Sequence, residues 1–64
     1  MTKEEASAEV DRLMELAPND LAYDEWHVAI WNRINDLMDY LLIEGWKEPD
    51  PEWNEPPRPE GVEP

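Results

Sequence analysis

The segment from Asn19 to Trp46 carries more apolar surface on one side than a single neighbouring helix can cover. Placed at 100° per residue, its large apolar side chains span an arc of about 160°, whereas an ordinary surface helix needs about 100°. The residues of this arc are Tyr23, Trp26, Ile30, Trp31, Ile34, Leu37, Met38, Leu41 and Leu42. The pattern predicts one long amphipathic helix of about six or seven turns. One short neighbouring helix would not cover its apolar face, so a further partner is expected.

Both ends of this segment carry helix-boundary residues. Asn19 or Asp20 is expected to cap the first backbone amides with its side-chain oxygen. Gly45 is expected to adopt the left-handed conformation just past the last turn, with Trp46 folding back onto that turn near Leu41. These signals predict a helix that begins near Asn19 and ends before Gly45.

Residues 2–17 are predicted to form a shorter first helix. Thr2 and Glu5 have the spacing of a capping box, in which each side chain satisfies a backbone amide of the other residue. Pro18 disfavours helical geometry at the residue before it and should end the helix. One narrow apolar stripe is expected, formed by Ala6, Val10, Leu13, Met14 and Ala17.

The expected fold is an all-α antiparallel hairpin of a short and a long helix over residues 1–46. A tight turn at Pro18, Asn19 and Asp20 would join the helices, because short links favour antiparallel neighbours. The longer helix would overhang the shorter one from Tyr40 to Trp46. Small cores are marginally stable, so the uncovered apolar surface predicts dimerisation into a four-helix bundle.

Residues 47–64 differ sharply from the rest of the chain. Six of the seven prolines lie in this segment, mixed with six acids. Proline removes backbone donors and acids resist burial, so this composition predicts a disordered acidic tail. Trp53 stands alone within it, and two alternatives remain open: it docks on the helices, or it anchors the tail on a partner.

The net charge is −12, from 17 acids and 5 bases. Such a chain is repelled by nucleic acids and by anionic membranes, and it is attracted to basic protein surfaces. Acids are spread over both helices and the tail, which favours a surface selected for negative potential; a merely solubilising surface is the alternative. The predicted acidic surface consists of Asp11, Glu15, Asp20, Asp24, Glu25, Asp36 and Asp39.

The sequence offers little for catalysis, and we expect no enzyme, no cofactor and no metal site. There is no cysteine, one histidine (His27) and one serine (Ser7), and neither glycine belongs to a phosphate-binding loop. Asp24 and His27 have the i, i+3 spacing of carboxylate–histidine bundle sites, but no further inward carboxylate accompanies them. We expect His27 to be a core or interface histidine bonded to a carboxylate or carbonyl.

A binding face is expected along the wide apolar arc. Four tryptophans in 64 residues are an unusual enrichment, and Trp26 and Trp31 lie near the edges of the arc, where they would anchor a partner or fill a core. The predicted partner-binding residues are Tyr23, Trp26, His27, Ile30, Trp31, Ile34, Met38, Leu42 and Trp53.

These features predict a small acidic inhibitor or adaptor that binds another protein. In its sharper form the chain is a DNA mimic that blocks a basic nucleic-acid-binding surface, and it would need both helices of a dimer to approach the charge density of a duplex. Its format resembles the small inhibitors encoded by phages and mobile elements, including anti-restriction, anti-CRISPR and glycosylase-inhibitor proteins. No motif of this chain matches any one of these families, so no functional residue is carried over.

Two alternatives remain open: a structural protein forming an obligate helical oligomer, and an antitoxin-like neutraliser of a basic toxin. No stretch approaches the 18 consecutive apolar residues of a membrane span, and the first residues lack the apolar core of a signal peptide. We therefore expect a cytoplasmic protein.

Overall fold

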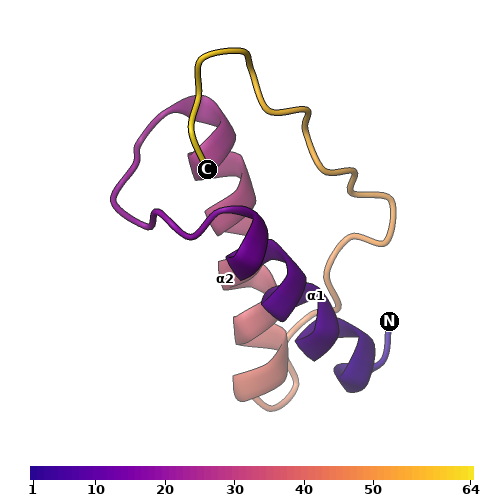
Figure 1. Cartoon of the computed structure of the whole chain (residues 1–64). Helices are drawn as coiled ribbons and strands as arrows, with labels where there is room; N and C mark the ends of the chain where they lie inside the picture. The colour runs from indigo at the N-terminus through magenta and orange to yellow at the C-terminus, as the bar shows by residue number, and fades with distance from the viewer.

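The computed structural model describes residues 1–64 and contains two α-helices and no strand. Helix α1 spans Lys3–Leu16 and helix α2 spans Glu25–Leu42. The helices pack against each other and run in roughly opposite directions, and the tail returns past both of them (Figure 1). The predicted all-helical hairpin is confirmed. Neither helix has the length and apolar character required to cross a membrane.

Helix α1 begins and ends where its local signals predict. The Thr2 hydroxyl accepts a hydrogen bond from the Glu5 backbone N–H at 3.1 Å, and the Glu5 carboxylate accepts one from the Thr2 N–H at 3.0 Å. This reciprocal capping box satisfies two amides that the helix itself leaves free. At the other end Ala17 is the C-cap, directly before Pro18.

Helix α2 is shorter than predicted, and its start is the main correction. The helix begins at Glu25, not near Asn19, because Asp24 is the N-cap and its carboxylate accepts the His27 backbone N–H at 3.1 Å. The Asn19 side chain instead accepts the Leu21 N–H at 3.2 Å, which stabilises a turn within the connection. The link between the helices is therefore residues 17–24, longer than the predicted tight turn.

The end of α2 also differs from the prediction. Ile43 is the C-cap in an extended conformation, and the Trp46 N–H donates to the Ile43 carbonyl at 3.1 Å. Gly45 has the expected positive φ, +79°, but it is the third residue of this turn and does not directly follow the last helical turn. Trp46 remains exposed and does not close the last helical turn.

The core lies between the two helices and contains eight buried apolar residues. Most of the apolar stripe predicted for the first helix packs against the centre of the apolar arc predicted for the second helix. The core residues are Ala6, Val10, Leu13, Ala17, Trp26, Ile30, Ile34 and Leu37.

The tail forms a third layer over the helices, in contrast to the disordered extension that its composition predicts. It has no helix or strand, yet Pro49 is buried and Trp53 and Val62 pack against the core. The Trp26 indole N–H donates to the Pro56 carbonyl at 3.0 Å. Figure 1 shows the tail passing beside α1, arching over the molecule and ending near the first turns of α2.

The predicted overhang from Tyr40 to Trp46 is covered in part by the start of the chain. The Tyr40 hydroxyl donates to the Met1 carbonyl at 2.7 Å, and the Lys3 amine lies 3.6 Å from the centre of the Tyr40 ring. Leu42, by contrast, is 76% exposed. Only the last residues of the predicted overhang therefore remain open.

The capping box gives a test of the predicted start of α1. Replacing Thr2 by alanine should lower the free energy of unfolding by about 1 kcal/mol, because the Glu5 amide loses its partner. Urea denaturation followed by circular dichroism measures the change. Thr2→Ser keeps the hydroxyl and should unfold near the wild-type midpoint; equal losses in both variants would contradict the capping role.

Candidate protein-binding surface

Arg33 joins both helices to the tail. Its side chain is buried on α2, where one guanidinium nitrogen donates to the Asp50 carbonyl at 3.0 Å and another to the Glu9 carboxylate at 3.4 Å. The guanidinium carbon also lies 5.1 Å from the centre of the Trp53 ring, within the range of a cation–π contact. A buried charge is costly unless it is paired, so this position favours a docked tail.

A chain of ion pairs extends this junction across α1. Glu9 lies 3.7 Å from Arg12, and Arg12 lies 2.5 Å from the Glu55 carboxylate. The Arg12–Glu55 pair is exposed, so it contributes little to stability by itself. It nevertheless places Glu55 of the tail beside α1.

His27 occupies a second junction, between the start of α2 and the end of the tail. Its side chain is buried, its Nδ1 lies 2.6 Å from the Asp24 carboxylate, and its Nε2 lies 3.3 Å from the Pro64 oxygen. The Asn19 N–H donates to the same oxygen at 3.2 Å. His27 is thus a core histidine with polar partners on both nitrogens. No group of three or more metal-ligating side chains is present.

The nine predicted partner-binding residues divide into three groups. Trp26, His27, Ile30 and Ile34 are buried within one chain. Trp31, Met38 and Trp53 are half-buried at the edge of the core, and Tyr23 and Leu42 are exposed. The first group does not form an accessible face, because the tail and α1 cover it.

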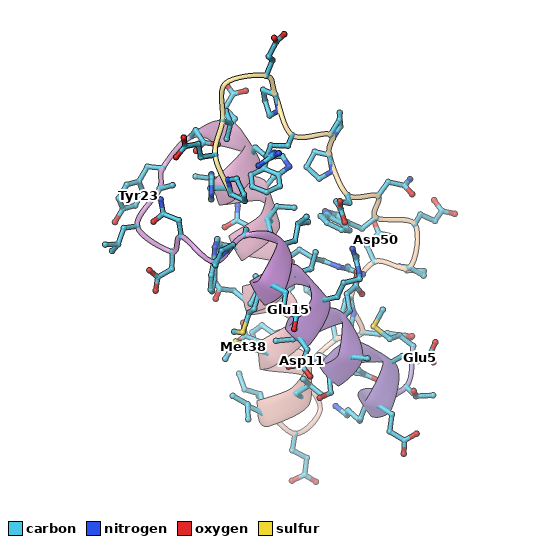
Figure 2. All side chains as sticks on the ribbon, viewed as in Figure 1. Glu5, Asp11, Glu15, Tyr23, Met38 and Asp50 are labelled. Atoms are coloured by element: carbon cyan, nitrogen blue, oxygen red, sulfur yellow. The ribbon has the colours of Figure 1, made fainter.

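The accessible apolar residues lie mainly at two places outside the core. Leu21 and Tyr23 are exposed on the link between the helices, where Figure 2 shows Tyr23 projecting away from both helices. Leu42, Ile43 and Trp46 are exposed at the end of α2. Ile43 and Trp46 belong to the overhang that the sequence predicts to be uncovered, but the exposure of Trp46 itself was missed, because its ring was expected to fold back onto the last helical turn near Leu41.

The buried role of Arg33 was missed as well, although the sequence carried a signal for it. Arg33 is three residues from Ile30 and four from Leu37, so it shares their side of the helix. It is also the one base between residues 19 and 46. A lone base on an apolar helix face indicates a paired, inward position.

The outward-facing charge is mostly negative. Five of the seven predicted acids are exposed, and Asp24 and Asp39 are half-exposed. Figure 2 shows Asp11 and Glu15 on the same side of α1. Three of the five bases, by contrast, make contacts within the chain: Lys3 with Tyr40, Arg12 with two glutamates and Arg33 at its buried junction.

No family model, curated protein or solved structure matches the chain. The function of the chain is therefore inferred from its fold and its surface.

Replacing Arg33 tests the junction of helices and tail. Arg33→Met keeps most of the apolar length but leaves Glu9 and the Asp50 carbonyl without their partner, and we expect a loss of about 2–3 kcal/mol in unfolding free energy. Arg58→Met, at an exposed position of the same tail, should change it by less than about 0.5 kcal/mol. Equal effects in denaturant titrations would show that Arg33 does not hold the tail.

Asp24 generates a prediction on pH. Its pKa is lowered from the ordinary value of 3.8, chiefly because the carboxylate accepts the His27 backbone N–H. A lowered folded-state pKa means that the stabilisation is present above the unfolded pKa and is lost as the pH falls through the folded one. Asp24→Asn keeps a capping oxygen, so its stability deficit should be full at pH 6 and should shrink below about pH 4. A deficit that stays constant down to pH 2 would contradict this assignment.

Proposed function

We propose that this chain is a small acidic protein that binds a basic surface of another protein, as an inhibitor or adaptor. The observation that carries the proposal is the division of charge: three of the five bases are used inside the chain, while most of the acids face solvent. A net charge of −12 on so small a body attracts a basic partner at long range and raises its association rate.

A basic surface that normally binds nucleic acid is the most suitable target by charge. The molecule is 39 Å long, and duplex DNA of that length carries about 23 charges at one per ~1.7 Å. The chain carries 17 acids and a net charge of −12, so one molecule supplies about half the net charge of the duplex. This charge density supports competition between the chain and DNA for the basic surface of a cytoplasmic protein. Two copies side by side would match the charge of the duplex.

An obligate helical oligomer is the second candidate, and the exposed apolar residues at the two ends favour it. A four-helix bundle built on the apolar face of α2 would require the tail to leave Trp26 and His27, with which it makes hydrogen bonds. A dimer that keeps the tail in place would have to use Leu42, Ile43 and Trp46 or the exposed link. An antitoxin-like role would use the same acidic surface as the inhibitor.

Salt dependence separates the acidic binder from the apolar oligomer. The immobilised chain is exposed to a cell lysate at 50 mM and 500 mM salt, and captured proteins are identified and ranked by isoelectric point. We expect basic proteins at low salt, at least ten-fold depletion of them at high salt, and displacement by added duplex DNA, because screening shortens the range of exposed charges.

The matched control removes charge without touching the core. Asp11→Asn combined with Glu15→Gln neutralises two exposed carboxylates on α1 and should weaken capture while leaving the helical content unchanged. Identical capture at both salt concentrations, by wild type and variant alike, would contradict the proposal and favour apolar assembly.

A further inference from the structure

Three large apolar residues are exposed at the end of α2, and Leu42, Ile43 and Trp46 are together called here the α2-end patch. The exposed fractions are 76%, 43% and 39%, respectively. These residues lie within five consecutive positions, and the turn closed by the Trp46 N–H and the Ile43 carbonyl brings the backbones of Ile43 and Trp46 close together. Large apolar side chains gathered and exposed in this way are typical of contact surfaces.

The surroundings of the α2-end patch are negative. Asp39 lies in the last turns of α2, Glu44 follows the helix, and the last turn contains no basic residue. The free carbonyls at a helix C-terminus add negative potential, which favours cations there. Apolar side chains and negative potential therefore coincide at this end of the molecule.

A hollow of about 240 Å³ adjoins the patch through Trp46. Its lining combines one aromatic ring with three carboxylates and a single base: Asp36, Trp46, Lys47, Glu48, Pro49 and Asp50. An indole face beside carboxylates suits an arginine or lysine side chain, through cation–π and charge-assisted contacts. The Glu48 carboxylate also pairs with the Met1 amine, and one Asp50 carboxylate oxygen accepts the Glu52 N–H at 2.9 Å. Asp36 is therefore the lining carboxylate that is most available to a guest cation.

We propose that the α2-end patch and its hollow dock a basic amphipathic segment of the partner protein. An apolar side chain of that segment would cover Leu42 and Ile43, and an arginine or lysine would enter the hollow beside Trp46. This docking mode resembles the recognition of amphipathic helices by their apolar anchors. The inference rests on the proposed function, since it assigns the binding of a basic partner to one place.

The charge on the molecule argues against a second copy at this patch. Two chains of net charge −12 would bring Asp39 and Glu44 of each against those of the other, and like charges in contact are unfavourable. The other exposed apolar pair, Leu21 and Tyr23, borders none of the three hollows. It therefore serves as an internal control.

The test uses a synthetic helical peptide of leucine and arginine and a sequence-matched peptide with glutamate in place of arginine. Titrated into ¹⁵N-labelled full-length chain at 50 mM salt, the basic peptide should shift the indole N–H of Trp46 and the amides of residues 39–47. The acidic peptide should shift neither. Shifts confined to residues 20–24, or spread evenly over α1, would overturn the proposal.

Three exposed-site variants make the assignment specific. Leu42→Ser should weaken peptide binding at least five-fold, whereas Leu21→Ser, at an equally exposed leucine, should leave it unchanged. Lys47→Glu should tighten binding two-fold or more, because it removes the only base that lines the hollow. Equal affinity of all three variants and wild type would overturn the proposal.

The same variants separate this inference from the proposed function. If wild type and Leu42→Ser capture the same basic proteins in a salt-dependent way, the acidic binder stands and its docking place is wrong. If wild type captures no basic protein at low salt, the proposed function itself fails. Sedimentation that shows a wild-type dimer, lost in Leu42→Ser, would assign the patch to a second copy and overturn the inference.

Discussion

The apolar face of α2 is too wide for one helix to cover, and the way in which the chain covers it determines the rest of the structure. Helix α1 packs on the centre of the face, and the tail closes the side that α1 leaves open. Arg33 lies where these three segments meet, with partners on α1 and on the tail. A chain with no cysteine thus gains a third layer without a disulfide.

The negative charge opposes this compact arrangement, because like charges repel and favour expansion. The chain limits the cost by directing its few bases to the contacts between segments: Arg12 to Glu55, and Arg33 to Glu9. The consequence is a surface on which the remaining acids are largely unopposed. The use of the bases in internal contacts therefore both stabilises the fold and leaves the acidic surface that would attract a basic partner.

The sequence predicts α1 well because its signals are local. The capping box joins residues three apart, and Pro18 acts on the residue directly before it. The start of α2 was misplaced because Asn19, Asp20 and Asp24 are all acceptable caps, and the choice depends on distant contacts. Asp24 also bonds the His27 ring, and that ring faces Pro64 at the other end of the chain.

The tail shows where composition misleads. Prolines and acids predict disorder when they are averaged over a segment, yet docking depends on a few specific groups, such as the Trp53 ring and the Pro56 carbonyl. Their partners, Arg33 and Trp26, are 20 and 30 residues away, a separation that no local pattern reveals. Four residues of the predicted apolar arc, Trp26, Ile30, Ile34 and Leu37, are buried as a core, whereas Tyr23 lies before α2 and is exposed, as is Leu42. The cover of the arc was assigned to another molecule, although the tail provides part of it.

Backbone ¹⁵N relaxation of the full chain tests the three-layer arrangement most directly. If the tail is docked, the amides of Asp50, Trp53 and Val62 should have order parameters near about 0.8, close to those of α2, because the docked backbone moves little. Order parameters below about 0.6 throughout residues 47–64, in a chain whose helices remain folded, would contradict the account.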